Sequence, residues 1–450
     1  MAGSSQHAHW SSRWTFIMAA VGSAVGLGNI WKFPYEVNAG GGGAFVMVYL
    51  AFVFLIGTPL LIAELSLGRR GQLSPIRSME KIAKEEGRKN WWALVGWSGV
   101  LGSFIVISFY SVVGGWTLSY VVEAISGSMA GITGDAAEAK FNALVSSPIT
   151  PIVWHAVFMA ITVGIVLRGV EGGLEKAVTL LMPALFVLLV GLVIYSGITG
   201  DFGSAVNFLF APDWSKMNAD VALNALGQSF FSLSLALGSI MVYGSYLTRD
   251  VKIGKAAVTI AAADSGVALL AGLAIFPIVF GFGLTPGKEE GLVFMTLPIA
   301  FGQMTGGVIV GTLFFGLLTV AAITSSISLL EPSVSYLAET DKLSRKKAAF
   351  TIGIAAFIMG SFSSLGFGAL SDTTIFGMSI IGFKSYITNN LMMPLAGMFM
   401  AIFIGWFVSR KSMIDELAME EPWFRIWYFM IKFICPLAIL VVFYNIVFGF

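Results

Sequence analysis

The sequence predicts an all-α integral membrane protein, and two observations support this fold class. Hydrophobic residues make up 57% of the 450 residues and charged residues only 11%, and the mean hydropathy is +0.85. This balance lies far from that of a soluble globular domain. In addition, long apolar runs alternate with polar loops, and these runs can cross a bilayer as helices. The chain is therefore expected to form one transmembrane domain, residues 1–450.

The apolar runs predict about eleven transmembrane helices, of which the third and eighth are long enough to tilt or to project beyond the bilayer. Their expected limits are 13–37, 43–69, 91–124, 152–169, 173–197, 219–247, 256–284, 300–338, 346–362, 374–409 and 423–448. Residues 369–386 contain glycines and polar residues, so a re-entrant or surface helix before the tenth span is an alternative there. The connection 124–151 is expected to be a solvated outer loop.

The positions of Lys and Arg predict the orientation in the membrane. Loops at 69–89, 249–255, 342–347 and 410–411 contain sixteen such residues, whereas the opposite loops contain little more than Lys140, Lys216 and Lys288. This excess places the N-terminus in the cytoplasm, and an odd number of spans places the C-terminus outside. The first apolar run shows no separate cleavable signal and is expected to be the first span.

Several classes of protein are disfavoured by the sequence. A net charge of +1 gives no reason to expect nucleic-acid binding, and no nucleotide-binding loop or soluble domain supports an ATP-driven pump. The single cysteine, Cys435, excludes an internal disulfide and is expected to be a small apolar filler. No obligatory protein partner is evident.

The first span contains a helix-breaking segment at residues 22–34, GSAVGLGNIWKFP. Three glycines and Asn29 within eight residues are poor helix formers. At membrane depth, non-helical backbone persists only where it is buried in protein or lines a cavity. A Gly-xxx-Gly packing face at Gly22 and Gly26 is the alternative. Asn29 and Pro34 favour a broken helix that holds a ligand.

A second interruption lies in the sixth span at residues 228–239, QSFFSLSLALGS. Breaks five helices apart are the best sequence indication of the central site of an inverted-repeat transporter. Half-helix N-termini can bind a carboxylate, and exposed carbonyls can bind a cation. We therefore expect five-plus-five inverted repeats, residues 1–197 and 219–409, followed by an additional helix at 423–450.

Oxygen-bearing side chains occur near the middle of the same spans: Asn29, Ser232, Asp264, Thr324 and Ser325. Hard cations bind oxygen ligands. Asp264 carries most weight, because an ionisable residue inside a membrane span is a functional candidate. The alternative for the three hydroxyls is bonding to carbonyls of their own helices. Together with Asp264 and the two breaks, they favour an ion site.

The chain resembles the neurotransmitter:sodium symporter family, particularly its bacterial amino-acid members, over nearly its whole length. The motifs that carry the resemblance are Trp10, Val25-Gly-Leu-Gly-Asn29, Phe33-Pro34, Gly41-Gly-Gly-Ala-Phe45, Gly57-x-Pro59, Glu64, Gly68-Arg69, Trp116-Thr-Leu118, Phe230-Phe-Ser-Leu-Ser234, Thr324-Ser-Ser326 and Leu343-Ser-Arg345. This resemblance implies a sodium-coupled symporter in a bacterial inner membrane that imports a hydrophobic amino acid by alternating access and is not an enzyme.

The resemblance also implies two sodium sites and one substrate pocket. The first sodium site would use the Ala24 carbonyl, Asn29, Ser232, Asp264 and the carboxylate of the substrate. The second would use the carbonyls of Gly22, Val25 and Ala321 and the hydroxyls of Thr324 and Ser325. The substrate would contact the amides of Leu27 and Gly28, the hydroxyl of Tyr110, the carbonyls of Ala24, Phe231 and Ser234, Ser232 beside the ion, and the side chains of Val106, Phe231, Leu237, Ser325 and Leu329.

Departures from the family pattern shape two further expectations. Asp264 stands where relatives commonly have Asn, and Ala268 replaces the residue linked to chloride, so transport is expected to be independent of chloride. A proton that replaces sodium at Asp264 would give proton antiport.

The expected gate residues are Lys32, Glu36 and Phe231 outside and Tyr246 and Glu339 inside. The usual outer acid is replaced by Ser385, and the usual inner arginine by His7.

The sequence disfavours two other functions, a channel and an intramembrane enzyme. A channel needs a continuous polar pore, and the aromatic residues Phe230, Phe231 and Tyr110 argue against one. An intramembrane enzyme needs a catalytic pair, and Asp264 has no obvious histidine or acidic partner in the sequence.

Overall fold

The computed structural model describes residues 9–285, 291–340 and 343–448. Within these ranges the chain is helical, and the only bridges between extended residues are the isolated pairs Gly42–Pro212 and Ile375–Met378. The all-α prediction is confirmed. Lys288, Lys342 and His7, which entered the predictions of orientation and inner gating, lie outside the described residues.

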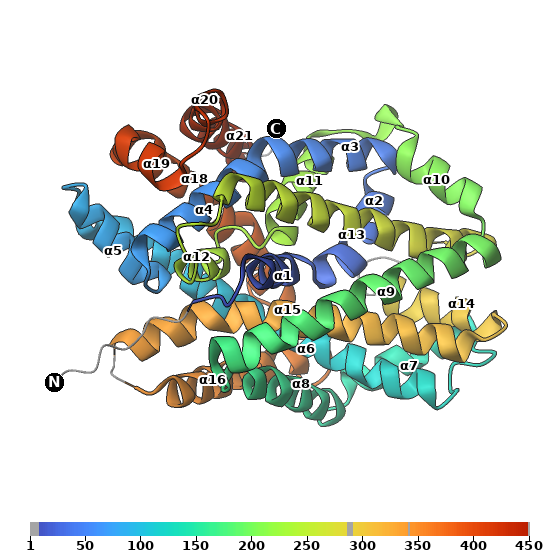
Figure 1. The fold of residues 1–450 in the computed structure, drawn as a ribbon. Coiled ribbons are helices and arrows are strands. Elements are labelled where there is room, and N and C mark those ends of the chain that lie inside the picture. Colours follow the sequence, from blue (N-terminus) through green and yellow to red (C-terminus); the bar gives the residue numbers. More distant parts are fainter. Residues whose placement is uncertain (1–8, 286–290, 341–342, 449–450) are drawn as a thin grey trace.

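The helices of the first half of the chain are spread through the whole elongated molecule (Figure 1). The helices of this half, with η for short π- or 3₁₀-helical segments, are α1 (Arg13–Ala24), η1 (Gly28–Lys32), α2 (Phe33–Ala39), α3 (Gly43–Phe52), η2 (Val53–Gly57), α4 (Thr58–Gly71), α5 (Pro75–Glu85), η3 (Asn90–Trp92), α6 (Ala93–Ile125), α7 (Gly134–Ser146), α8 (Thr150–Val166), η4 (Val170–Glu175) and α9 (Lys176–Thr199).

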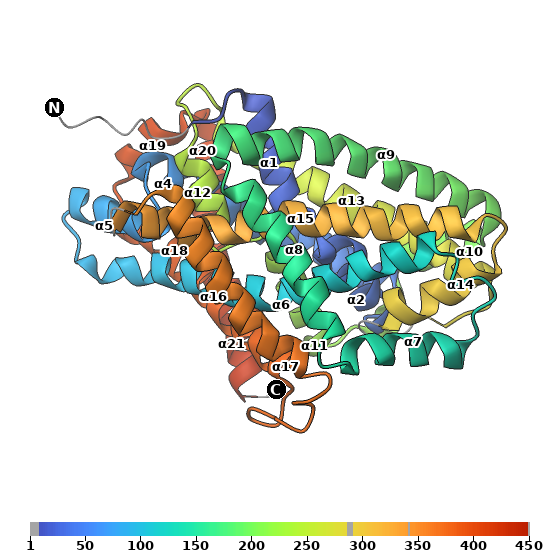
Figure 2. The same cartoon turned by 90° about the horizontal axis from the view of Figure 1, so that it is seen from below.

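The helices of the second half lie between those of the first half, so the two halves interleave (Figures 1 and 2). The second half contains α10 (Phe202–Phe210), η5 (Trp214–Lys216), α11 (Ala219–Ser232), α12 (Ser239–Ser245), α13 (Ile253–Gly281), η6 (Leu292–Thr296), α14 (Leu297–Gln303), α15 (Gly307–Thr340), α16 (Arg345–Leu365), α17 (Ile380–Tyr386), η7 (Ile387–Met392), α18 (Met393–Ile402), η8 (Phe403–Phe407), α19 (Arg410–Leu417), α20 (Glu421–Phe429), η9 (Met430–Ile434) and α21 (Cys435–Phe448).

Local sequence determines where several helices begin. The Ser12 hydroxyl accepts a hydrogen bond of 3.1 Å from the Thr15 amide at the start of α1. The Asn218 side chain accepts one of 2.9 Å from the Val221 amide at the start of α11. These contacts satisfy amides that lack a partner within the helix. Proline occupies the first turn of α4, α5 and α8, where its missing N–H is tolerated.

Eight described helices are long and apolar enough to cross a membrane, and two bent helix pairs also meet these criteria as units. One bent pair is α1 with the segment Gly28–Ala39, and the other is α7 with α8. The sixth predicted span is divided into α11 and α12. The multi-span architecture is therefore present, while the number eleven stays a prediction.

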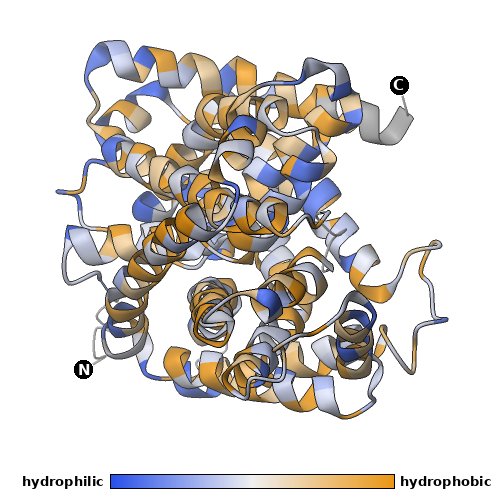
Figure 3. Cartoon of the chain, turned by 90° about the vertical axis from the view of Figure 1, so that its right-hand side faces the viewer, coloured by the Kyte–Doolittle hydropathy of each residue, from blue (hydrophilic) through white to orange (hydrophobic). Residues whose placement is uncertain are grey.

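Exposed apolar side chains follow the outside of the bundle. On α9, Leu180, Val187 and Ile198 are 72%, 72% and 78% exposed. Apolar colour also dominates the helices in Figure 3. In a water-soluble protein such residues would be an aggregation hazard, whereas acyl chains of a bilayer solvate them.

Three connections differ from expectation. The predicted solvated loop 124–151 contains α7, whose Phe141 is buried and lies edge-on to Trp116. The helix α14 is separate from α15, so the eighth span begins at residue 307 rather than 300. The tenth span begins at residue 380 rather than 374 and continues to 407. Packing against distant aromatic residues orders the outer connections, and this is not visible in local hydropathy.

Candidate functional site

The first span is broken where the glycines predicted it. Helix α1 ends at Ala24, Val25 is extended with φ −71° and ψ 109°, and the following segment is bent from α1 by 48°. Gly26 lies so close to other helices that an added Cβ would overlap the Ser325 hydroxyl and stand 2.7 Å from the Tyr110 hydroxyl. Glycine is therefore needed at position 26 because side chains of α15 and α6 lie against the backbone there, and not only because glycine breaks the helix.

The second break separates α11 from α12 over residues 233–238. Ser234, Ala236 and Gly238 have φ values of +52°, +60° and +74°, in the left-handed region that favours glycine. The buried Glu64 carboxylate on α4 accepts a hydrogen bond of 2.8 Å from the Ala236 amide. Glu64 thus stabilises the non-helical backbone, the internal structural role that its position in the second span suggests.

Asp264 on α13 lies fully buried between the two breaks. Its Oδ1 accepts a hydrogen bond of 2.7 Å from the Asn29 side-chain amide, and its Oδ2 accepts one of 2.8 Å from the Ser232 hydroxyl. The Tyr49 hydroxyl on α3 lies 3.3 Å from the same Oδ2 and 3.0 Å from Ser232 Oγ. Three predicted ion ligands therefore meet, and Tyr49 is a fourth member that sequence analysis missed.

This Asp264 cluster, defined as Asn29, Tyr49, Ser232 and Asp264, has a clear electrostatic character. Hydrogen bonds from amide and hydroxyl donors stabilise an ionised carboxylate. The bundle excludes water from these side chains, so a charge here interacts strongly with a nearby cation. The cluster joins both broken spans to α13 and α3.

A second group of oxygens lies where α15 crosses the break in α1. The Ser325 hydroxyl is 3.4 Å from the Gly22 carbonyl and 3.2 Å from the Val25 carbonyl. The Thr324 hydroxyl donates to the Ala321 carbonyl of its own helix, at 3.0 Å. Ser325 therefore points across to α1, whereas Thr324 makes the intrahelical bond that was the alternative interpretation. All five predicted members of the second site lie in this region.

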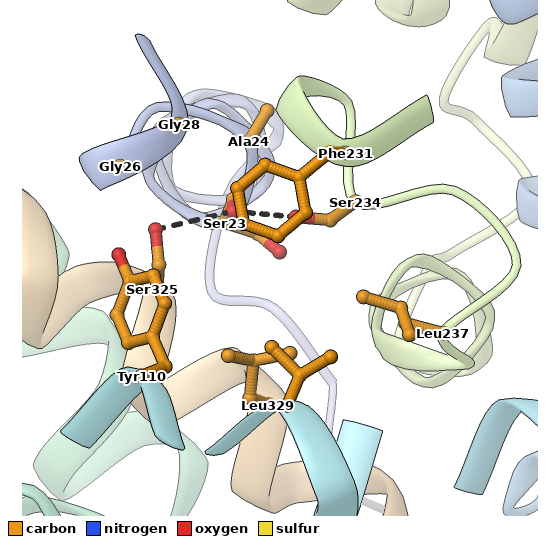
Figure 4. A pocket seen from close by; sticks show the side chains of 11 residues that line it. Ser23, Ala24, Gly26, Gly28, Tyr110, Phe231, Ser234, Leu237, Ser325 and Leu329 are labelled. Carbon is orange, nitrogen blue, oxygen red and sulfur yellow. Dashed lines mark hydrogen bonds between the residues drawn. The ribbon is translucent and has the colours of Figure 1, made fainter. Parts of the chain in front are cut away.

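A pocket lies between the two breaks (Figure 4). It is lined by Ser23, Ala24, Gly26, Gly28, Val106, Tyr110, Phe231, Ser234, Leu237, Ser325 and Leu329. Nine of these residues were predicted substrate contacts, and Ser23 and Gly26 are additions. Its free volume of about 20 Å³ holds about one water molecule, so an amino acid can enter only if the lining residues move apart.

The remaining predicted substrate contacts flank this pocket. The Leu27 amide donates a hydrogen bond of 3.2 Å to the Tyr110 hydroxyl. Ser232 faces Asp264 at the side of the pocket. The pocket consequently has a polar end of amide and hydroxyl groups and an apolar end where Leu237 and Leu329 lie (Figure 4), and Val106 is a further apolar lining residue.

Beyond the pocket, Lys32 and Phe231 form a contact at the end where the outer gate was predicted. The Lys32 ammonium lies 4.8 Å from the centre of the Phe231 ring, a cation–π distance. Glu36 is half-buried one helical turn after Lys32. Lys384 instead points inward, is 8% exposed, and donates to the Met359 carbonyl at 2.8 Å and to the Ser363 hydroxyl at 2.6 Å.

At the opposite end of the pocket, the predicted inner-gate residues Tyr246 and Glu339 make hydrogen bonds with different partners. The Tyr246 hydroxyl donates to buried Glu331 at 2.6 Å, and Arg345 bonds both Glu331 oxygens at 2.7 and 2.6 Å. Glu339 accepts from the Ser74 hydroxyl at 2.6 Å. Sequence analysis missed Glu331, although an acidic residue inside an apolar span is a signal that could have found it.

The family of this chain follows from its similarity to known proteins. The model of the sodium:neurotransmitter symporter family matches residues 7–142 and 142–450. The chain belongs to this family. It is a multi-pass membrane transporter and a sodium-dependent symporter, not an enzyme, and the resemblance drawn from the motifs is confirmed.

Individual relatives cover nearly the whole transporter. It is 38% identical to the uncharacterized sodium-dependent transporter YhdH of Bacillus subtilis, over 97% of each chain. It is 35% identical to an uncharacterized sodium-dependent transporter of Haemophilus influenzae, over 98% of each chain. The crystal structure of MhsT in complex with L-phenylalanine superposes with a TM-score of 0.91 and 42% identity, covering 97% of this chain and 99% of that one.

Proposed function

We propose that the transporter imports a zwitterionic α-amino acid with an apolar side chain, coupled to two sodium ions and independent of chloride. The observation that carries this proposal is the pocket between the broken spans, polar at one end and apolar at the other. MhsT, 42% identical, was crystallised with L-phenylalanine, which has this chemistry.

In this proposal the polar end binds the α-carboxylate of the substrate. The amides of Leu27 and Gly28 and the Tyr110 hydroxyl are the donors, and they lie where α1 gives way to η1. The carbonyls of Ala24, Phe231 and Ser234 receive the ammonium group. Val106, Leu237 and Leu329 bring no charge to the side chain, so desolvating an acidic or basic side chain would be unfavourable there.

The two oxygen groups described above are the proposed sodium sites. The first uses the Asp264 cluster, the Ala24 carbonyl and the substrate carboxylate. The second uses the carbonyls of Gly22, Val25 and Ala321 with the hydroxyls of Thr324 and Ser325. Because the substrate carboxylate is itself a ligand of the first ion, sodium and substrate would strengthen each other's binding reciprocally.

Chloride independence follows from the Asp264 carboxylate. Two cations at mid-membrane need compensating negative charge, since water does not screen them. Asp264 supplies this charge within the Asp264 cluster, and Ala268, one turn later on α13, has no hydroxyl that could hold an anion. A proton that binds Asp264 after sodium leaves would make proton antiport part of the cycle.

Alternating access would then open one end of the pocket at a time. The Tyr246–Glu331–Arg345 contacts must separate for release at the inner end, and the Lys32–Phe231 contact must separate for entry at the outer end. We assign the N-terminus to the cytoplasm from the Lys and Arg distribution, and the protein to a bacterial inner membrane from its resemblance to bacterial members of the family. We propose a single domain of two inverted repeats, 1–197 and 219–409, plus the last helix.

Uptake into proteoliposomes tests this function. Radiolabelled phenylalanine should accumulate only with an inward sodium gradient and should saturate. Unlabelled leucine, methionine and aromatic amino acids should compete, whereas glutamate, lysine and decarboxylated amines should not. Stronger competition by the amines or by charged amino acids would exclude the proposed substrate class, and non-saturating flux would point to a channel.

A further inference from the structure

A second cavity lies away from the transport site, beside the helix α14. Its volume is about 270 Å³, more than ten times that of the substrate pocket and close to the lower end of small-molecule sites, about 300 Å³. It is lined by Ala124, Met129, Ala130, Phe301, Gly302, Met304, Gly306, Gly307, Val308 and Ile309. Every lining residue is apolar or glycine, so the cavity suits a hydrocarbon and offers no charged group to a polar ligand.

Three segments build the walls of this cavity. The segment after α6 is joined to α14 by a hydrogen bond of 2.8 Å from the Gly131 amide to the Gly302 carbonyl. An added Cβ on Gly302 would overlap the Met129 carbonyl, so this approach depends on glycine. The hairpin between α14 and α15 forms the third wall. The cavity is therefore a feature of fixed backbone contacts.

The level of the bilayer can be inferred from the neighbouring helix α9. The Tyr195 hydroxyl of α9 donates a hydrogen bond of 2.8 Å to the Thr305 carbonyl in the hairpin. Ile198, which follows Tyr195 on α9, is 78% exposed and still apolar. Tyrosine is enriched at the membrane–water interface, with the acyl chains beside it. The hairpin and the cavity thus lie at the outer edge of the hydrocarbon region.

The mouth of the cavity is continuous with the membrane-facing surface. Val308 and Ile309, on the first turn of α15, are 42% and 66% exposed. Val122 and Ile125 on the last turn of α6 are exposed as well. Acyl chains already solvate such residues in a membrane protein, so an acyl chain can reach the cavity along Val308 and Ile309, while the polar cluster of Glu123, Ser128 and Lys140 lies beside the α6 wall.

We propose that a phospholipid acyl chain occupies this cavity and packs between α14, α6 and α15. Burial of hydrocarbon against Met129, Phe301 and Met304 provides the binding energy. The acyl chain then supports α14, whose preceding segment η6 stacks Phe294 on Phe141 of α7. This inference does not depend on the identity of the transported substrate.

The test uses the transporter in vesicles that contain phosphatidylethanolamine with a photoreactive diazirine in one acyl chain. After irradiation, mass spectrometry locates the labelled peptides. We expect labelling at Met129 or Met304 in addition to labelling around the exposed Ile198. If Ile198 is labelled and neither methionine is, the cavity contains water or nothing, and the proposal is wrong.

Two substitutions distinguish labelling from inside the cavity from labelling by the surrounding lipid. Ala130 lines the cavity and is exposed, so Ala130→Phe adds a large side chain at its rim that should obstruct an entering acyl chain, whereas Ala136→Phe places the same side chain at an exposed position on α7 outside the cavity. Labelling of both methionines should be lost in Ala130→Phe and kept in Ala136→Phe, with Ile198 labelled in both. Equal methionine labelling in the two variants would also contradict the proposal. If Ala130→Phe does not fold, the labelling of Met129 and Met304 in the unmodified transporter still decides the proposal.

Discussion

The two proposed sodium sites use the same ligand element, oxygen, but in different chemical forms. The Asp264 cluster consists of side chains from four elements, centred on a carboxylate. The second group consists of backbone carbonyls and the hydroxyls of Thr324 and Ser325, with no ionised ligand. One site therefore combines charge with dipoles, whereas the other relies on dipoles alone.

This difference teaches where the transporter is most sensitive to substitution. Removing a charge in a buried environment changes an interaction that falls slowly with distance and is weakly screened. Removing one hydroxyl from a ring of carbonyls changes a single dipole among several. Substitutions at the two sites should consequently differ in magnitude, and the following predictions proceed from the largest effect to the smallest.

The largest effect is expected for Asp264→Asn, which keeps the size of the side chain and removes its charge. Sodium-driven uptake should be lost in sodium chloride at the concentrations that saturate the unmodified transporter. A chloride ion would supply the missing charge, but Ala268 has no hydroxyl to hold it, so high chloride should restore only a small part of the uptake, as compared with gluconate. Full uptake by Asp264→Asn in gluconate would show that the carboxylate is not the compensating charge.

Asn29→Ala should weaken sodium and substrate binding together. It removes the amide that donates to Asp264 and a ligand of the first ion, and a hydrogen bond to a charged group contributes about 1.5–3 kcal/mol. Thermal-shift titrations of sodium with and without phenylalanine would measure both affinities. A change in the sodium affinity alone would separate Asn29 from the coupling between the ligands.

Thr324→Val combined with Ser325→Ala should weaken sodium binding by ~1–3 kcal/mol, the cost of leaving partners without two hydroxyls. The neighbouring Ser326→Ala is the matched control, since its hydroxyl bonds Thr162 and the Ile323 carbonyl on another face of α15. Sodium dependence of uptake measures both. Identical sodium curves for the double variant and Ser326→Ala would reject the second site.

Tyr49→Phe should have a smaller effect, about 0.5–1.5 kcal/mol in sodium affinity, because one hydrogen bond to the Asp264 cluster is lost. Its control is Tyr120→Phe, the same change at a buried tyrosine whose hydroxyl donates to the Phe294 carbonyl at 2.9 Å, outside the Asp264 cluster. Sodium titration of phenylalanine uptake compares the two. An affinity in Tyr49→Phe no different from that in Tyr120→Phe would remove Tyr49 from the site.

The smallest effect is expected when gluconate replaces chloride around the unmodified transporter. Uptake should stay unchanged, since Asp264 carries the compensating charge in the protein itself. The sodium concentration is held constant in both buffers. A large fall in uptake would overturn the proposed role of Asp264 and would require an anion site elsewhere.

The sequence predicted much of this site because its signals are local. Gly26 and Gly28 follow the end of α1 at Ala24 and mark the break in the first span, whereas Gly22 lies inside α1. The predicted ligands Asn29, Ser232 and Asp264 are polar residues in apolar runs. Tyr49 could not be distinguished in the same way, because a tyrosine in an apolar run is most often a packing residue. Only its distance of 3.3 Å to Asp264 reveals it.

The ends of the pocket contain contacts that motif matching did not supply. Tyr246 and Glu339 were expected as members of the inner gate, yet Glu331 is the acid to which Tyr246 and Arg345 bond. Lys384 adjoins the expected position of the outer acid but turns inward to Ser363. Both outcomes depend on side-chain direction and on packing between helices that lie far apart in the chain.

The sequence by itself determined the membrane class, the two breaks and most residues of the pocket. Hydropathy and helix propensity act over neighbouring residues, so they can be read without knowing the fold. Only the tertiary structure decided which oxygens converge on Asp264, which acid meets Arg345, and how α14 forms a cavity beside α6. Those contacts join segments tens to hundreds of residues apart, and they depend on the crossing and rotation of packed helices, which no local pattern specifies.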